Sequence, residues 1–275
     1  MLSDKIAAEF LELSSEQRLG IIQMLKTKKS KLSEIAKKLD STNSEAHRNL
    51  SRLTKAQIIS KDGDGNYHLT AYGNMLCLMI PSLRFFGDNK KFFSNHGFGS
   101  LPANYIQAIG SLADSKRISG YVRVMECWKN IYQNATKYIY NILNEVSYDS
   151  ETINIVKDKL KSGMAINTVF IENAVISDNR KDILENTELG KLIKNSHLER
   201  RFSKDASIVM VLNEKQSSVA FPTTDGKIDI SEVFYSDSPE FHDWCLSLFR
   251  HNWEHSTAFF DEKLKNQSGE HSNHI

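Results

Sequence analysis

The stretch KLSEIAKKLDSTNSEAHRNLSRLTKAQIISKDGDGNYHLTAYG, residues 31–73, decides the fold of the first part of this chain. Two helices are predicted from apolar residues at helical spacing: Leu32, Ile35, Ala36 and Leu39, then Ala46, Leu50 and Leu53. Residues 40–43 (DSTN) provide a turn and an N-cap between the helices. Two β-prone runs, 58–59 and 67–69, flank DGDGN at 62–66, which is typical of a hairpin turn. The stretch therefore predicts a helix, a turn, a second helix and a hairpin.

This order of elements is typical of proteins that place their second helix in the major groove of double-stranded DNA. With the apolar stripe turned inward, the outer face of the second helix is polar and basic. Its candidate DNA contacts are Ser44, His47, Arg48, Ser51, Arg52 and Lys55. Arginine can fork onto guanine edges, and serine, histidine and lysine reach bases or phosphates. The plainer alternative is an amphipathic helix with a solvated basic face, but the turn and the hairpin favour DNA binding.

The hairpin and the segment before the first helix add further candidate contacts. We expect the hairpin to act as a wing that lies against the DNA backbone or the minor groove, through Lys61, Asn66, Tyr67 and His68. We expect phosphate contacts from Lys28, Lys29 and Lys31.

The charge is unevenly distributed along the chain, although the net charge of its 275 residues is only +1. Between Lys26 and Lys61 there are 10 Lys or Arg and 3 Asp or Glu, so this segment carries 10 − 3 = +7. Residues 76–275 hold 23 basic and 25 acidic residues, a net charge of −2. A basic module followed by a mildly acidic body predicts a DNA-binding domain and a second domain with another role.

Several features place limits on the class of protein. Cys77, Cys127 and Cys245 are far apart and lack metal-binding spacing, so we expect buried thiols in a reducing compartment. The N-terminus lacks the apolar core of a signal peptide, and the longest apolar run, residues 75–80, is too short to span a bilayer. We therefore expect a cytoplasmic protein that has no membrane contact and no cofactor or bound metal.

The second half of the chain alternates between helical and strand-like patterns. Helices are expected at 121–136, 150–162 and 238–260, with strands at 138–143, 164–171, 198–202, 207–213, 216–222 and 228–236. This alternation followed by a meander predicts an α/β domain with a mixed sheet. The expected divisions are a winged helix-turn-helix domain at 1–75, a helical connector at 76–119, an effector domain at 120–260 and a disordered tail at 261–275.

The first domain resembles the ArsR-like winged-helix regulators of prokaryotes, and LTAYG at 69–73 matches the passage from their last wing strand into a helix. The resemblance implies a homodimer formed by the flanking helices. Candidate subunit contacts in this chain are Ile6, Phe10 and Leu13 in the first helix and Phe85, Phe86, Phe92 and Phe93 in the connector. Packing of these phenylalanines within the chain and a membrane-surface role are the alternatives.

The chain is also similar, from about residue 3 to 258, to archaeal regulators of the methanogenesis regulatory protein type. The similarity lies in FFSNHGFGSLPANYIQAIGSLADS (92–115), LKSGMAINTVF (160–170), SIVMVLNEKQSSVAFPTTDGKID (207–229) and DWCLSLFRHNWEHS (243–256). The same segments resemble, more distantly, half of a phospholipase D fold, as in the sugar-responsive TrmB regulators. Phospholipase D chemistry requires a histidine nucleophile with a lysine two residues later, and no histidine of this chain has that neighbour. We therefore expect a non-catalytic domain with a sensor or dimerisation role. As a sensor it would bind a small-molecule effector that is still to be identified, and the alternative is a ligand-free architectural or dimerisation module.

If that domain has a pocket, polar-tipped aromatic and basic residues are expected to line it: Trp128, Tyr138, Tyr140, Arg180 and Arg201. The alternative for each residue is core packing or a solvated surface. The competing function is a phospholipase-D-like or metal-dependent hydrolase that docks on nucleic acid.

A metalloprotease pattern, H-x-x-E-H, occurs at His251–His255. It requires a third ligand well downstream, and the given sequence ends at residue 275, so packing of a helix is the preferred interpretation. The acidic turn at 62–66 superficially resembles a calcium loop, but its twelfth position is Gly73 rather than a carboxylate.

Overall fold

The computed structural model describes residues 2–146, 149–176, 188–195, 198–260 and 265–266. The chain divides into two compact units, Met1–Leu83 and Arg84–Ile275. The expected boundaries at 75 and 119 differ from this division. The expected connector is shared between the units, because its first part continues a helix of unit 1 and its phenylalanines pack into the core of unit 2.

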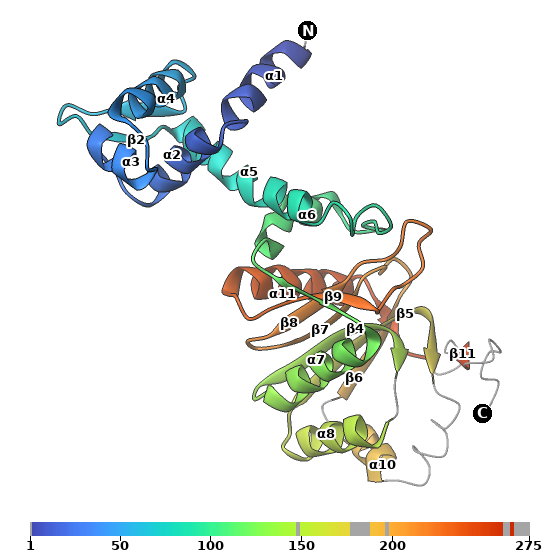
Figure 1. Ribbon diagram of the computed structural model, residues 1–275. Coiled ribbons are helices and arrows are strands. Elements are labelled where there is room, and N and C mark those ends of the chain that lie inside the picture. The colour runs from blue at the N-terminus through green and yellow to red at the C-terminus, as the bar shows by residue number, and fades with distance from the viewer. Residues whose placement is uncertain (1, 147–148, 177–187, 196–197, 261–264, 267–275) are drawn as a thin grey trace. The chain divides into compact units, whose positions relative to one another are not determined.

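Unit 1 contains helices and one hairpin in the predicted order (Figure 1). Its elements are α1 (Leu2–Leu13), α2 (Glu16–Thr27), α3 (Leu32–Lys38), α4 (Asn43–Lys55), β1 (Ile59–Lys61), β2 (Tyr67–Leu69) and the first part of α5 (Ala71–Asp88). Ser15 and Thr42 cap α2 and α4 through their side chains, and Thr42 lies in the segment 40–43 where the sequence predicts an N-cap. The core of this unit consists mainly of aliphatic side chains from α2, α3, α4 and the hairpin: Ile21, Ile22, Leu25, Ile35, Leu50, Leu53, Ile58, Ile59 and Leu69.

The start of α5 is fixed to the hairpin by one hydroxyl and one glycine. The Thr70 hydroxyl donates to the Gln57 carbonyl oxygen at 2.7 Å and accepts from the Gly73 amide at 3.0 Å. A Cβ at Gly73 would lie 2.1 Å from the Ile58 carbonyl oxygen, so only glycine allows the helix to approach this closely. The sequence LTAYG therefore sets the exit from β2 into α5.

Unit 2 is built around a mixed sheet, as the sequence predicts. In the described residues it has nine strands, ordered β10-β6-β5-β4-β7-β8-β9-β3 with β11 beside β5. The strands are β3 (Lys116–Ser119), β4 (Tyr138–Val146), β5 (Ala165–Ile176), β6 (Leu198–Ser203), β7 (Val209–Asn213), β8 (Ser217–Ala220), β9 (Glu232–Ser236), β10 (Thr257–Ala258) and β11 (Lys265–Asn266). β4, β5 and β6 are parallel, and the other neighbours along this order are antiparallel.

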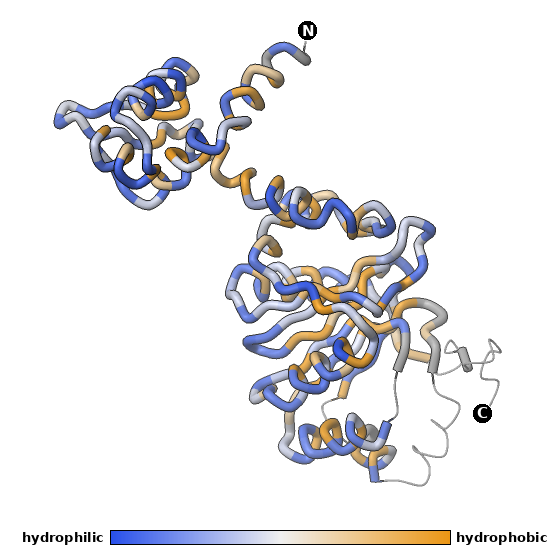
Figure 2. The backbone as a smooth tube through the Cα atoms, viewed as in Figure 1, coloured by the Kyte–Doolittle hydropathy of each residue, from blue (hydrophilic) through white to orange (hydrophobic). Residues whose placement is uncertain are grey.

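Helices cover both faces of this sheet (Figure 1). α11 (Pro239–Glu254) lies on one face, and α7 (Tyr121–Asn134) lies on the other with α8 (Ser150–Lys161) and α10 (Glu188–Asn195) beyond it. The residues before the sheet form α6 (Ala103–Gln107) and the short 3-10 helix η1 (Ile109–Leu112). Apolar residues lie along the central strands of this sheet (Figure 2), since these strands are covered on both faces.

The phenylalanines of the connector pack into the core of unit 2. Phe85 and Phe92 are 1% and 5% exposed, and both rings contact Phe234 at centroid distances of 5.2 and 5.1 Å. Phe86 and Phe93 are partly buried and pack against the same cluster. The prediction of a dimer contact is therefore wrong for Phe85 and Phe92, because the chain buries them itself. For Phe86 and Phe93, which keep some exposed surface, it stays a prediction.

Two further expectations about secondary structure are corrected. Residues 116–119, expected to be helical, form β3 because they pair with β9. The final helix was expected to run to residue 260, but α11 ends at Glu254 and β10 then pairs with β6. In both cases pairing with a distant strand overrides the local pattern. Of the expected disordered tail, residues 265–266 form β11, and the rest lies outside the described residues.

Candidate nucleic-acid interface

Helix α4 separates buried apolar residues from exposed polar ones. Ala46, Leu50 and Leu53 are at most 1% exposed. Thr42 caps the helix, and its hydroxyl accepts from the Glu45 amide while Glu45 accepts from the Thr42 amide, a reciprocal capping box. Because these contacts fix the rotation of the helix, its other side faces outward. The residues on that side that the sequence predicts as DNA contacts are Ser44, His47, Arg48, Arg52 and Lys55, all exposed, and Ser51, partly exposed.

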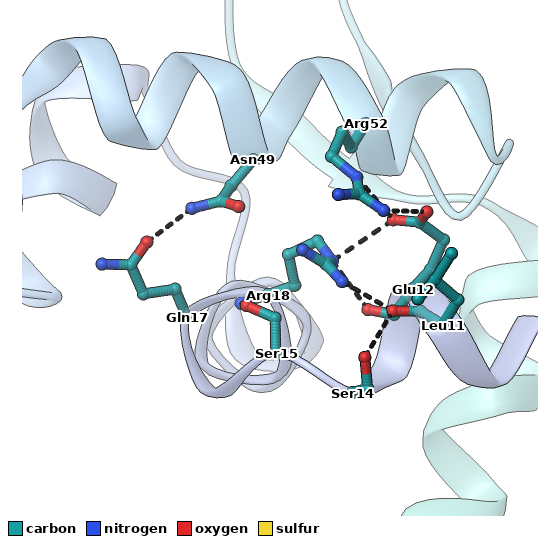
Figure 3. Close-up of polar contacts among 8 residues, drawn as sticks. All are labelled: Leu11, Glu12, Ser14, Ser15, Gln17, Arg18, Asn49 and Arg52. Carbon is teal, nitrogen blue, oxygen red and sulfur yellow. Dashed lines mark hydrogen bonds and ion pairs between the residues drawn. The ribbon is translucent and has the colours of Figure 1, made fainter.

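Arg48 and Arg52 differ in their surroundings, although both were predicted to contact the groove. Arg48 forms no ion pair with any residue that the structure describes. Arg52 is bound to Glu12 of α1: its Nη2 lies 2.6 Å from Oε1 and its Nε lies 3.2 Å from Oε2 (Figure 3). This hydrogen bond lowers the pKa of the Glu12 carboxyl, and the charge of Arg18 acts in the same direction against the effect of burial. The sequence gives no signal for a pair that spans 40 positions.

The hairpin of β1 and β2 is stabilised by Asp62 in its turn. One carboxylate oxygen of Asp62 accepts from the Asn66 amide at 2.9 Å and from the Asp64 amide at 3.2 Å, and the other lies 3.4 Å from Lys29 Nζ. The bond from the Asn66 amide lowers the pKa of Asp62, so this carboxylate stays charged. Lys29 is therefore paired with the turn of the hairpin, while Lys28 and Lys31 are exposed on the same segment.

Not all of the residues predicted to contact DNA from the hairpin have exposed side chains. Tyr67 is 8% exposed and belongs to the core of unit 1, so the prediction that it contacts DNA is wrong. Alternation along β2 places Tyr67 and Leu69 inward together, which the sequence pattern alone did not reveal. Lys61 is exposed, with its ammonium 5.5 Å from the centre of the Tyr67 ring. Asn66 and His68 are partly exposed, and His68 contacts the Ser60 hydroxyl at 3.1 Å.

Of the residues predicted to line an effector pocket, four are described: Tyr138, Tyr140 and Arg201 lie along one stack of rings with Phe249 and Trp253, and Trp128 packs in another cluster. Tyr138 and Tyr140 stack at 4.3 Å on the α11 face, and Tyr140 stacks on Phe249 at 4.5 Å. Burial raises the pKa of Tyr138 to about 12, and its hydroxyl lies 3.1 Å from His242 Nε2. These tyrosines are therefore packing residues. Trp128 belongs to α7 and packs on the opposite face of the sheet. Arg180 lies outside the described residues.

Among the described residues of the predicted pocket set, Arg201 lies beside a cleft. The cleft has a volume of about 610 Å³ and is lined by Leu198, Arg200, Arg201, Ser256, Thr257, Ala258 and Phe259. The Arg201 guanidinium lies 4.3 Å from the centre of the Trp253 ring, and its Nη1 donates to the Trp253 carbonyl oxygen at 3.1 Å. The cleft is open to solvent, and its basic side chains are already engaged with neighbouring aromatic rings.

Neither the metalloprotease pattern nor the cysteines form a recognisable reactive site. His251 and His255 lie at the end of α11, with ring centroids 4.3 Å apart, and His255 Nδ1 lies 2.7 Å from the His251 carbonyl oxygen. In the part of the chain that the structure describes, no three His, Cys, Asp or Glu side chains are grouped to hold a metal ion. Cys77, Cys127 and Cys245 are buried free thiols, as expected. No helix among the described residues is long and apolar enough to cross a membrane.

Comparison with known proteins gives structural likenesses only. No protein-family model matches the chain, and neither does any curated protein. The archaeal chromatin protein TrmBL2 is similar over 94% of this chain and 100% of its own, with 11% identity and a TM-score of 0.40. Nuc, a phospholipase D family member from Salmonella typhimurium, is similar over 53% of this chain and 99% of its own, with 12% identity and a TM-score of 0.38. An IclR transcriptional regulator from Alicyclobacillus acidocaldarius covers 86% of this chain and 96% of its own, with 13% identity and a TM-score of 0.26. At such low identities and TM-scores, these likenesses do not carry a function over to this chain.

Proposed function

We propose that this chain is a sequence-specific DNA-binding transcriptional regulator and that its first unit is a winged helix-turn-helix domain. The observation that carries the proposal is α4: its apolar side is buried, its outer side presents Arg48 with no ion pair in the described residues, and a hairpin follows directly. A capped helix with an exposed polar and basic face is suited to the major groove. The finer resemblance to ArsR-like and methanogenesis-type regulators remains a prediction.

The charge of the surrounding segment supports the same function. Residues 26–61 carry 10 basic and 3 acidic residues, a net charge of +7, and the lysines at 28 and 31 are exposed. Such a segment neutralises phosphates and releases counterions, which gives affinity that falls steeply with salt. The sequence selectivity would come from α4 and the general affinity from the lysines and the wing.

In vitro selection tests this proposal directly. The full-length chain is incubated with a library of random-sequence duplexes, bound duplexes are amplified over several rounds, and the enriched sequence is footprinted. We expect one enriched motif, bound on the order of 10³-fold more tightly than a scrambled duplex. Enrichment of no motif, with equal affinity for selected and scrambled duplexes, would contradict the proposal.

We also propose that the protein acts as a homodimer through α1 and α5. Several apolar side chains of these two helices are exposed in unit 1: Ile6, Phe10, Leu11, Met75, Leu78, Met79 and Leu83, at 46–73%. The first part of α5 is strongly apolar (Figure 2), and residues 75–81 of this helix are all apolar. A hydrogen bond from the Tyr72 hydroxyl to Glu9 joins the two helices and raises the pKa of Tyr72 to about 12. A second copy is the natural cover for this surface, because a two-fold axis doubles the DNA contacts of one small domain.

For unit 2 we propose a sensor role without hydrolysis. No histidine in the sequence precedes a lysine by two positions, and the cleft beside Arg201 is the candidate effector site. Native mass spectrometry of the purified protein should reveal a retained small molecule. A phosphodiesterase or peptidase activity that disappears in His251→Ala or His255→Ala would contradict the proposed absence of hydrolysis.

A further inference from the structure

Arg52 lies on α4 where direct base reading is least expected. In helix-turn-helix proteins the N-terminal residues of the recognition helix contact base edges. α4 spans Asn43–Lys55, so Arg52 is in its last turn, while Arg48 is one turn closer to the N-terminus. The Arg52 guanidinium also already donates two hydrogen bonds to one carboxylate. These observations indicate a role for Arg52 other than base contact.

The carboxylate that holds Arg52 is itself held firmly in place. Glu12 Oε2 lies 3.2 Å from both Arg18 Nε and Arg52 Nε, and Oε1 lies 2.6 Å from Arg52 Nη2. The Glu12 side chain is 16% exposed and that of Arg18 is 8% exposed. Moving Arg52 away would leave a half-buried carboxylate with only one partner, and removing one member of a partly buried pair is costly.

Arg18 fixes the end of α1 that carries Glu12. Its Nε donates to the Glu12 carbonyl oxygen at 2.8 Å, and its Nη2 donates to the Leu11 carbonyl oxygen at 2.6 Å (Figure 3). Helix ends leave such carbonyl groups without intrahelical partners, so Arg18 caps α1 from α2. The position of the Glu12 carboxylate is thus determined by the corner between α1 and α2.

A second polar contact joins α4 to the same corner. Asn49 is 8% exposed, and its Nδ2 donates to Gln17 Oε1 at 2.6 Å. Asn49 and Arg52 are three residues apart, so they lie on one face of α4 and contact α2 and α1 respectively (Figure 3). Because these two contacts lie at different positions along α4, together they restrict rotation of the helix about its axis.

We propose that Glu12 is a positioning residue for DNA recognition: by binding Arg52 it orients α4, and it thereby determines how well Arg48 and its neighbours discriminate between sequences. The inference rests on the proposed DNA-binding function. Recognition side chains must be held within about 0.5 Å and 10–20° of their productive geometry, so loss of a contact that orients the helix reduces discrimination. Glu12 is expected to act without touching DNA.

If Arg52 itself contacts a base, the Glu12 variant should change the affinity for the selected duplex in the opposite direction. If Arg52 read a base, Glu12 would compete with DNA for the guanidinium. Removing the Glu12 charge would then release Arg52 and strengthen binding to the selected duplex. If Glu12 positions α4, the same change weakens that binding, because the helix is held less firmly.

The experiment compares full-length variants on two probes, the duplex selected by the wild-type chain and a scrambled duplex of equal length. The variants are Glu12→Gln, Arg52→Ala and the double variant. Glu16→Gln is the matched control: it removes the same charge from an exposed residue in the first turn of α2, for which the structure gives no contact with α4. The quantity measured is the ratio of the two affinities, and thermal unfolding checks that each variant is folded.

We expect Glu12→Gln to lower the ratio on the order of tenfold relative to Glu16→Gln, the size associated with loss of a charged hydrogen bond. Arg52→Ala should give a similar loss, and the double variant should be no worse, since one contact is removed in all three. Sequence preference should weaken at every position that α4 reads, with an unchanged slope of affinity against salt.

Two results would overturn the inference: a ratio in Glu12→Gln equal to that of Glu16→Gln, or tighter binding in Glu12→Gln together with weaker binding in Arg52→Ala. If Glu12→Gln does not fold, Glu12→Asp decides, because it keeps the charge beside Arg18 but is too short to hold both nitrogens of Arg52. A lowered ratio in Glu12→Asp supports positioning, and an unchanged or raised ratio contradicts it. If the proposed DNA-binding function is wrong, the experiment gives a different result, because the wild-type chain would then select no duplex.

Discussion

Replacement of Arg48 by alanine tests the assignment of α4 as the recognition helix. Arg48 is exposed, its helix is capped by Thr42, and it forms no ion pair among the described residues. The change therefore leaves no buried partner unsatisfied, and the free energy of unfolding should change by no more than about 0.5 kcal/mol. Any loss of DNA affinity can then be assigned to the interface itself.

The magnitude follows from the geometry of arginine. A guanidinium that forks onto one guanine contributes about 1–3 kcal/mol of discrimination, which is roughly a 5- to 150-fold change in the dissociation constant. The loss should be confined to the one or two base pairs that Arg48 faces. If Arg48 contacted a phosphate instead, the loss would be similar on all sequences and the salt slope would fall by about 1.

Fluorescence anisotropy at fixed salt provides the assay, with the duplex selected by the wild-type chain and its single-base variants as probes. Arg123→Ala is the control, because it removes the same charge from an exposed position on α7 of unit 2. Wild-type affinity of Arg48→Ala for the selected duplex, or an equal loss on every base variant, would refute the assignment of base reading to this side of α4.

Three further predictions address assembly, electrostatics and the thiols. Leu78→Asp places a charge in the exposed apolar surface of α5, where Leu78 is 73% exposed, and should weaken the dimer about 30-fold or more. Light scattering at low micromolar concentration should then give the mass of one chain, while the control Val122→Asp, at a 71% exposed apolar position of unit 2, should leave the mass unchanged. A dimer that persists in Leu78→Asp would exclude this surface. Neutralising Lys28 and Lys31 with glutamine should weaken binding to selected and scrambled duplexes alike and reduce the salt slope by about 1.8, whereas a loss restricted to the selected duplex would contradict phosphate contacts. Burial raises the pKa of Cys127 to about 11, so little of its thiol is ionised at pH 8. The buried thiols of the folded protein should therefore not react with a disulfide-exchange reagent. Rapid reaction before unfolding would contradict the burial of these thiols.

The sequence by itself determined the local structure on which the proposed function depends. Helical spacing of Ala46, Leu50 and Leu53 predicts which side of α4 is buried, and the cap at Thr42 and the turn at 62–66 mark where elements begin and end. The apolar runs at 138–143 and 164–171 predict β4 and β5, and the structure confirms both. These features are readable because capping and periodicity involve neighbours within a few residues of one another.

Only the tertiary structure decided which partners the side chains have. The sequence shows that phenylalanines gather at 85–93 but leaves open whether they contact a second subunit, a membrane surface or the chain itself, and the structure packs Phe85 and Phe92 on Phe234. It places Arg52 on the outer side of α4 but cannot reveal Glu12, which lies 40 positions away. β3 likewise becomes a strand only because β9, more than a hundred residues later, offers it an edge. The hydrophobic pattern of one segment shows which of its faces is buried. Which residues pack against that face depends on how segments distant in the sequence come together.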